Sequence, residues 1–172
     1  MNKDRIRFIT RTSVLLALTV VLQYVGRIVP LGPNSNFIVG PLVNACLIIS
    51  TYFVGILSGV VISILSVVGA ILTGAAMPLP LAPFIILGNL SLILAFYFLR
   101  SKKILGVVSG AVLKFAVIAI SSGLIIPVLK LPPKKTQTML FAFNWPQLVT
   151  ALIGGVIAII VINRLKKNFD EK

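Results

Sequence analysis

The sequence contains almost no acidic residues and no histidine. Among 172 residues the only carboxylates are Asp4, Asp170 and Glu171, so residues 5–169 hold neither Asp nor Glu. The body of the chain therefore has no paired carboxylates, no Ser-His-Asp triad and no His or carboxylate ligands for a metal. A proton relay through Asp, Glu or His is excluded for the same reason. We therefore expect a protein that is not an enzyme and uses no metal or other cofactor.

Cysteine and charged residues are scarce as well. Cys46 is the only cysteine, which excludes an internal disulfide, and its apolar neighbours predict a buried packing residue. Charged residues make up 11% of the chain and hydrophobic residues 58%, whereas about a quarter of an average soluble domain is charged. The sequence also has no phosphate loop of the G-x-x-x-x-G-K-[ST] type. We therefore expect that any ATP is hydrolysed by another chain.

Long apolar runs occupy most of the sequence. A helix that spans a membrane needs about 20 mostly apolar residues, and the runs predict an all-α integral membrane protein with six transmembrane helices in one domain, residues 1–172. The expected spans are residues 8–26, 39–55, 58–73, 84–99, 105–129 and 141–163. We expect the first span to be retained, because no small-x-small cleavage site follows it at the right place.

The segments between the spans are of two kinds. Residues 27–38, 74–83 and 130–140 each contain at least two prolines, and the six-span count places all three on one side. Four Lys or Arg residues lie on that side, whereas eleven lie in the two termini and the loop 100–103. Because positively charged loops stay in the cytoplasm, we expect both termini to be cytoplasmic in a multi-pass protein of the bacterial plasma membrane. The net charge of +13 then indicates membrane lipids with anionic headgroups as partners, and no nucleic acid.

One charged residue falls inside a predicted span. Lys114 lies about ten residues into the fifth span, which places it near the bilayer midplane. No carboxylate in the spans can pair with it, so its partner must be a backbone carbonyl, a neutral side chain, water, another chain or a ligand. Buried charges in a membrane are costly and usually have a function. The alternative is a lysine at a helix or subunit contact.

Amide side chains lie in the outer halves of other predicted spans, above Lys114. They predict a polar pocket that opens outward and holds a neutral or anionic small molecule, because the pocket offers a cation and amides but no anion. The candidate substrate-binding residues are Asn36, Asn44, Asn89, Lys114, Asn144, Trp145 and Gln147. Trp145 either stacks on a ligand ring or belongs to the aromatic belt of the membrane interface.

Several short segments carry a resemblance to a known family. They are Ser13-Val-Leu-Leu-Ala17, Gly40-Pro-Leu-Val-Asn44, Pro83-Phe-Ile-Ile-Leu-Gly-Asn89, Phe143-Asn-Trp-Pro-Gln147 and Gly154-Gly155. Over essentially the whole chain the sequence resembles the S components, the substrate-binding subunits of energy-coupling factor (ECF) vitamin transporters.

The resemblance implies an uptake function and a set of partners. It implies a six-helix subunit that binds a vitamin or related micronutrient outside and delivers it through a transmembrane T component powered by two cytoplasmic ATPase subunits. It also implies that small residues four apart on the first helix contact the T component. Ser13 and Ala17 occupy these positions here, with Ser13 in place of the usual alanine. Such spacing is common wherever helices approach closely.

Two other interpretations stay open from the residues alone. The first is a self-contained small membrane carrier or channel for a neutral or anionic solute. That class usually has an intramembrane acid or a filter-like motif, and the sequence has neither. The second is a structural or assembly protein of the membrane without a ligand, which would not need Lys114 beneath a set of amides.

Overall fold

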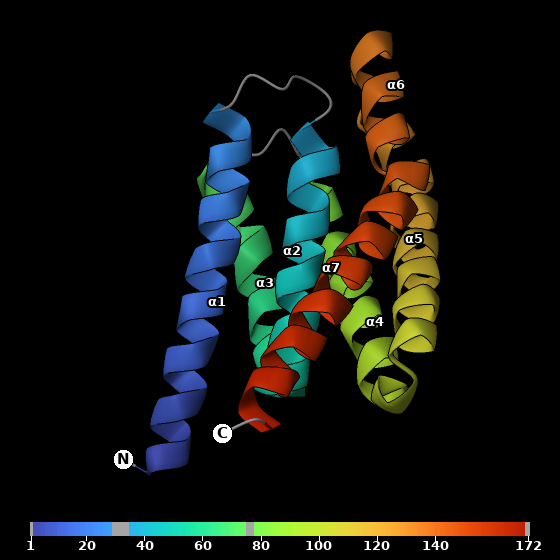
Figure 1. Cartoon of the computed structure of the whole chain (residues 1–172). Coiled ribbons are helices and arrows are strands. Elements are labelled where there is room, and N and C mark those ends of the chain that lie inside the picture. Colours follow the sequence, from blue (N-terminus) through green and yellow to red (C-terminus); the bar gives the residue numbers. More distant parts are fainter. Residues whose placement is uncertain (1, 29–34, 75–77, 171–172) are drawn as a thin grey trace.

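The fold is built of helices alone throughout the residues that the structure describes. The computed structural model describes residues 2–28, 35–74 and 78–170 (Figure 1), without the side chains of residues 27, 35, 36 and 168–170. The helices are α1 (Lys3–Ile28), α2 (Ser35–Phe53), α3 (Ile56–Leu72), α4 (Ala82–Phe98), α5 (Lys103–Val128), α6 (Pro133–Ala142) and α7 (Trp145–Asp170). Two single 3-10 turns, η2 (Leu79–Leu81) and η3 (Arg100–Lys102), precede α4 and α5.

Among the residues that the structure describes, four helical segments are long and apolar enough to cross a membrane. They are Lys3–Gly26, Leu79–Phe98, Arg100–Val128 and Pro133–Lys167, whereas the apolar helices Phe37–Phe53 and Ile56–Leu72 are shorter. At 1.5 Å per residue the 17 residues of α3 extend about 26 Å, close to the roughly 30 Å of a hydrocarbon core. The all-α membrane class is therefore confirmed, and the count of six crossings stays a prediction.

The turn between α2 and α3 depends on a glycine. Gly55 has a φ of 121°, which glycine adopts at little cost and other residues rarely adopt. Its N–H donates to the Ser50 carbonyl at 3.1 Å, and its own carbonyl accepts from Ser58 at 3.1 Å. Gly55 thus ends one helix and starts the next within three residues, and the predicted separation of residues 39–55 from 58–73 is confirmed.

The segment 130–140 is not the loop that we expected. Residues Pro133–Ala142 form α6, and a short turn at 143–144 separates α6 from α7, so the last long helix begins at Trp145 rather than at residue 141. Pro133 is the first residue of α6, where the missing N–H has no helical partner to lose. The N–H of Phe143 donates to the Met139 carbonyl at 3.0 Å and closes the far end of this helix. The last helix also continues to Asp170, past the expected end at residue 163.

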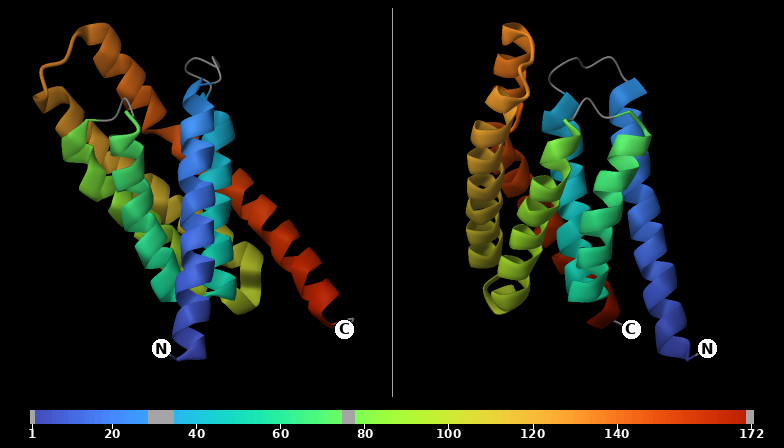
Figure 2. Two further views of the ribbon diagram at one scale, coloured as in Figure 1. Left: turned by 90° about the vertical axis from the view of Figure 1, so that its left-hand side faces the viewer. Right: turned by 180° about the vertical axis from the view of Figure 1, so that it is seen from behind.

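The described helices pack as a bundle in which α2 lies between α1, α3 and α7, and α6 extends beyond one end of it (Figures 1 and 2). The packing of α4 on α5 and of α2 on α7 is the most extensive. At the second contact a methyl group on Gly154 of α7 would collide with the Pro41 carbonyl oxygen of α2. Glycine therefore allows these two helices to approach closely.

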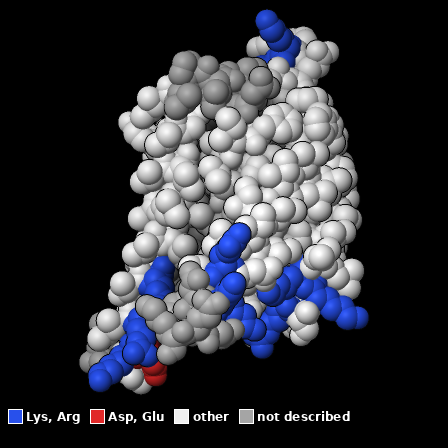
Figure 3. All heavy atoms as spheres, viewed as in Figure 1, with Lys and Arg blue, Asp and Glu red and all other residues white. Residues whose placement is uncertain are grey.

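Positive charge gathers at the end of the bundle that carries both termini. Figure 3 shows Lys and Arg side chains around this end, with a long white surface above them and a smaller basic patch at the other end. The exposed lysines of that smaller patch are Lys134 and Lys135 of α6. This distribution is the one that the predicted topology requires.

Cysteine labelling tests the topology. In a Cys46→Ala background, a membrane-impermeant maleimide should label Lys134→Cys in intact cells and Lys102→Cys only after permeabilisation, because the basic end should face the cytoplasm. Cys46 is buried, so its removal takes away no exposed thiol. Labelling of Lys102→Cys in intact cells, with protection of Lys134→Cys, would show that the chain has the opposite orientation in the membrane.

Candidate functional site

The site is centred on Lys114 in the middle of α5. Its side chain is only 5% exposed and lies on the buried face of α5 with Gly110, Ser121 and Ser122, as the spacing of these residues predicts. The side chain is thus directed into the bundle, toward α2 and α4.

Two asparagine oxygens accept hydrogen bonds from the Lys114 ammonium. Its Nζ donates to Oδ1 of Asn44 at 2.5 Å and to Oδ1 of Asn89 at 2.7 Å. Asn44 and Asn89 are 1% and 3% exposed. Hydrogen bonds to a charged donor are short and about twice as strong as neutral ones. Two neutral side chains are therefore the partners of this charge, one of the alternatives that the sequence left open.

The cluster of Lys114, Asn44 and Asn89 presents mainly donors to anything that enters it. An ammonium has three protons, and the asparagines accept two of them. Because each amide oxygen faces Lys114, each amide NH₂ is directed elsewhere and can donate to another acceptor. The cluster therefore suits a group with several acceptor oxygens, above all an anionic one.

Two glycines allow close helix contacts beside the asparagines, Gly88 between α4 and α5 and Gly154 between α7 and α2. A methyl group on Gly88 of α4 would lie 2.7 Å from Cγ1 of Ile118 and 3.5 Å from Cγ of Lys114. A methyl group on Gly154 would lie 2.7 Å from Cβ of Asn44. The close approach that holds the cluster together thus requires residues without a side chain at these two positions.

The outer candidates form a separate group at the start of α7. Trp145 is 47% exposed, and its ring centroid lies 5.8 Å from that of Phe37 and 5.5 Å from that of Phe141. Asn144 is exposed, and Nε2 of Gln147 donates to the Ala142 carbonyl at 3.1 Å. Within the described residues, no hydrogen bond links Asn144 or Gln147 to Lys114.

The two groups lie at different depths in the bundle. Gly154 lies against Asn44, and Gln147 precedes Gly154 by seven residues, which amounts to about 10 Å along the helix. The expected wall therefore divides into the buried Lys114 cluster and an outer set around Trp145. Asn36 is the second residue of α2, and its side chain lies outside the described residues.

The outward face of α1 carries the two candidate interface residues. Ser13 and Ala17 are exposed, and 11% of the apolar stretch of α1 is buried, against 33–39% in the other three long segments. On the opposite side, Oγ1 of Thr12 donates to Oγ of Ser58 at 2.9 Å in a buried contact with α3. This hydrogen bond, which the sequence analysis did not identify, helps to fix the rotation of α1.

The comparisons with known proteins give one match. A family model described as "ECF transporter, substrate-specific component" matches residues 7–165. Neither the search of curated proteins nor the search of solved structures finds a match. The matched range includes the Lys114 cluster, the outer set around Trp145 and the exposed pair on α1.

Replacement of Gly154 by alanine tests the contact that holds Asn44. Gly154→Ala should lower the free energy of unfolding by about 1–3 kcal/mol, because the added methyl group overpacks the contact between α2 and α7. Gly123→Ala is the matched control on α5, since a methyl group there meets no atom within 4 Å. It should leave stability unchanged or raise it by up to about 1 kcal/mol. Thermal unfolding in detergent measures both variants, and equal midpoints would contradict this packing.

Proposed function

Because the chain belongs to the family of ECF transporter substrate-specific components, we propose that it binds a vitamin-like small molecule, neutral or anionic, at the Lys114 cluster. In this role it is a binding subunit for uptake and not an enzyme. The bound molecule enters from the outer side and is released toward the cytoplasm.

The observation that carries the proposal is a buried ammonium held by neutral groups alone. Two amides stabilise the charge of Lys114 without neutralising it, and no carboxylate exists between residues 5 and 169. A ligand with a carboxylate would supply the missing opposite charge. A cationic ligand would meet repulsion and no counter-charge, so we exclude it.

Ligand entry requires a rearrangement of the helices. All three residues of the Lys114 cluster are at most 5% exposed, so the cluster is closed to solvent in this structure. The outer group of Asn144, Trp145 and Gln147 lies above it, and we place Asn36 in the same group. We propose that these residues contact the ligand as it passes or cover it once bound.

Transport depends on partner chains. The sequence has no phosphate loop, so we propose a transmembrane T component and two cytoplasmic ATPase subunits as partners. The weakly buried helix α1 provides the surface for the T component, with Ser13 and Ala17 at the closest approach.

Substitution of Lys114 tests the binding site. A panel of water-soluble vitamins and their precursors is first screened for thermal stabilisation of the purified protein, and the best ligand is then titrated. Lys114→Met should weaken binding by about 10- to 150-fold, because a hydrogen bond to a charged group contributes about 1.5–3 kcal/mol. Lys134→Met is the matched control, since Lys134 is an exposed lysine on α6. This variant should bind the ligand with the same affinity as the wild type.

A second variant separates binding from packing. Asn89→Asp places a carboxylate against the ammonium, so the protein should fold at least as well but bind an anionic ligand more weakly. Wild-type affinity in both Lys114→Met and Asn89→Asp would assign Lys114 to helix packing and refute this site.

Bulky residues on α1 test the partner surface. Ser13→Leu with Ala17→Leu should reduce co-purification with the T component and cellular uptake, because larger side chains keep the helices apart. Ligand binding by the isolated protein should be unchanged, since both residues face away from the bundle. Leu18→Phe with Val25→Leu is the control and should assemble normally, because both positions are exposed and lie seven residues apart on a face of α1 that is turned away from Ser13 and Ala17. Lost ligand binding with normal assembly would show that this face is not the interface.

A further inference from the structure

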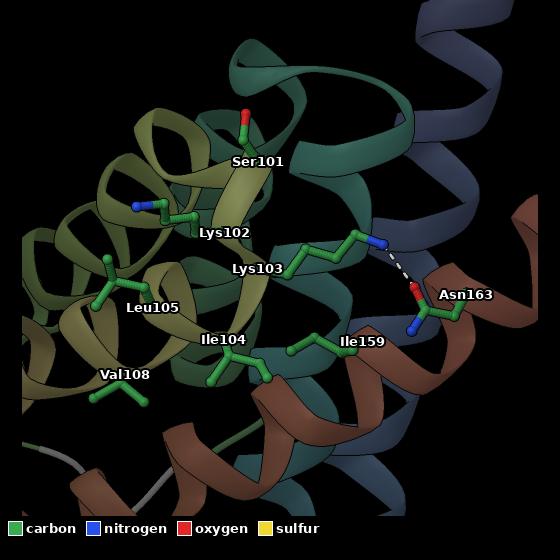
Figure 4. Close-up of a pocket in the computed structure, with 8 residues that line it drawn as sticks. All are labelled: Ser101, Lys102, Lys103, Ile104, Leu105, Val108, Ile159 and Asn163. Atoms are coloured by element: carbon green, nitrogen blue, oxygen red, sulfur yellow. Dashed lines mark hydrogen bonds between the residues drawn. The ribbon is translucent and has the colours of Figure 1, made fainter.

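A groove opens at the basic end of the bundle, far from the Lys114 cluster. It has a volume of about 620 Å³ and lies where η3 and the first turns of α5 meet the second half of α7 (Figure 4). Its walls include Lys102, Lys103 and Asn163 together with four aliphatic side chains. The substrate site proposed above makes no use of this groove.

The polar side of the groove is positively charged. Lys102 is exposed, whereas Lys103 reaches across to α7 and donates to Oδ1 of Asn163 at 2.6 Å. The Nζ of Lys103 also lies 5.5 Å from the ring centroid of Tyr52. These contacts hold Lys103 in place and neutralise no charge. No described residue that lines the groove is acidic.

The rest of the groove is apolar and continues toward the membrane body. Figure 4 shows Ile104, Leu105, Val108 and Ile159 together on one side of the two lysines. Ile104 is 74% exposed, and Leu105 and Val108 are also exposed. Lys102 ends η3 and Lys103 begins α5, and the apolar residues of α5 follow within two turns. The polar and apolar parts of a lipid follow one another in the same order from the membrane surface inward.

We propose that this groove binds one anionic phospholipid. Its phosphate lies against the Lys103 ammonium and Asn163, with the exposed Lys102 on the other side of the groove (Figure 4), and one acyl chain runs over Ile104, Val108 and Ile159. A small soluble anion would contact only the lysines and would leave the aliphatic walls of the groove exposed. A zwitterionic lipid would bring a cation of its own into the basic rim. Basic pockets between transmembrane helices are a known form of site for anionic headgroups.

Native mass spectrometry in a lipid mixture tests this proposal. The purified protein is mixed with equal amounts of phosphatidylglycerol and phosphatidylcholine that have the same acyl chains. The wild-type protein should retain one molecule of phosphatidylglycerol in preference to phosphatidylcholine. Each lysine near anionic lipid contributes about fivefold in affinity, so Lys102→Gln should reduce the preference about fivefold and Lys102→Gln with Lys103→Gln about 30-fold. Lys134→Gln with Lys135→Gln, the exposed pair on α6, should leave it unchanged.

Two further arms keep the interpretation unambiguous. Lys102→Gln leaves the contacts of Lys103 intact, so a reduced preference at an unchanged unfolding temperature reports on the groove and not on folding. An excess of inorganic phosphate or glycerol phosphate should not displace the lipid. The proposal is overturned if soluble phosphate displaces the lipid, if phosphatidylcholine binds equally well, or if the α6 pair has the same effect as the groove pair.

Discussion

Lys114 carries a positive charge in the interior of a bundle that has no carboxylate to neutralise it. An unpartnered ammonium there would be very costly, so two amide oxygens, from α2 and α4, are brought within 2.7 Å of it. This requirement sets the positions of α2, α4 and α5 relative to one another. Gly88 allows α4 to lie close to α5, and Gly154 allows α7 to pack closely against Asn44 of α2.

The same shortage of acidic residues explains how the chain meets its surroundings. On the face that Figure 3 shows, its positive charges lie mainly at the end with both termini, and the long surface between the two ends is uncharged. Both proposed ligand sites present a cation without a counter-charge, one in the interior for a substrate and one at the surface for a lipid headgroup. The transport role proposed above therefore takes its energy from other subunits, because the chain has neither a phosphate loop nor intramembrane acids that could couple to protons.

Much of this arrangement could be predicted from the sequence. The apolar runs located the long helices and the boundary between the second and third of them, and the isolated Lys114 left neutral side chains among its possible partners. The sequence could not show which amides meet the lysine, because Asn89 and Gln147 both lie on apolar helices and only packing separates them by depth. The α6 helix was missed because Pro132-Pro133 indicated a loop, although a proline also suits the first turn of a helix. The Thr12–Ser58 hydrogen bond joins residues 46 apart and depends on how α1 lies on α3.

A crystal structure of the substrate-loaded protein is the most direct test of the central role of Lys114. Our interpretation predicts an acceptor atom of the ligand within hydrogen-bond distance of Lys114 Nζ, either beside Asn44 and Asn89 or in place of one of them. The outer ends of the helices should differ from the closed arrangement described above. A ligand bound elsewhere, with both hydrogen bonds from Lys114 to Asn44 and Asn89 intact, would show that the ammonium serves only to join helices.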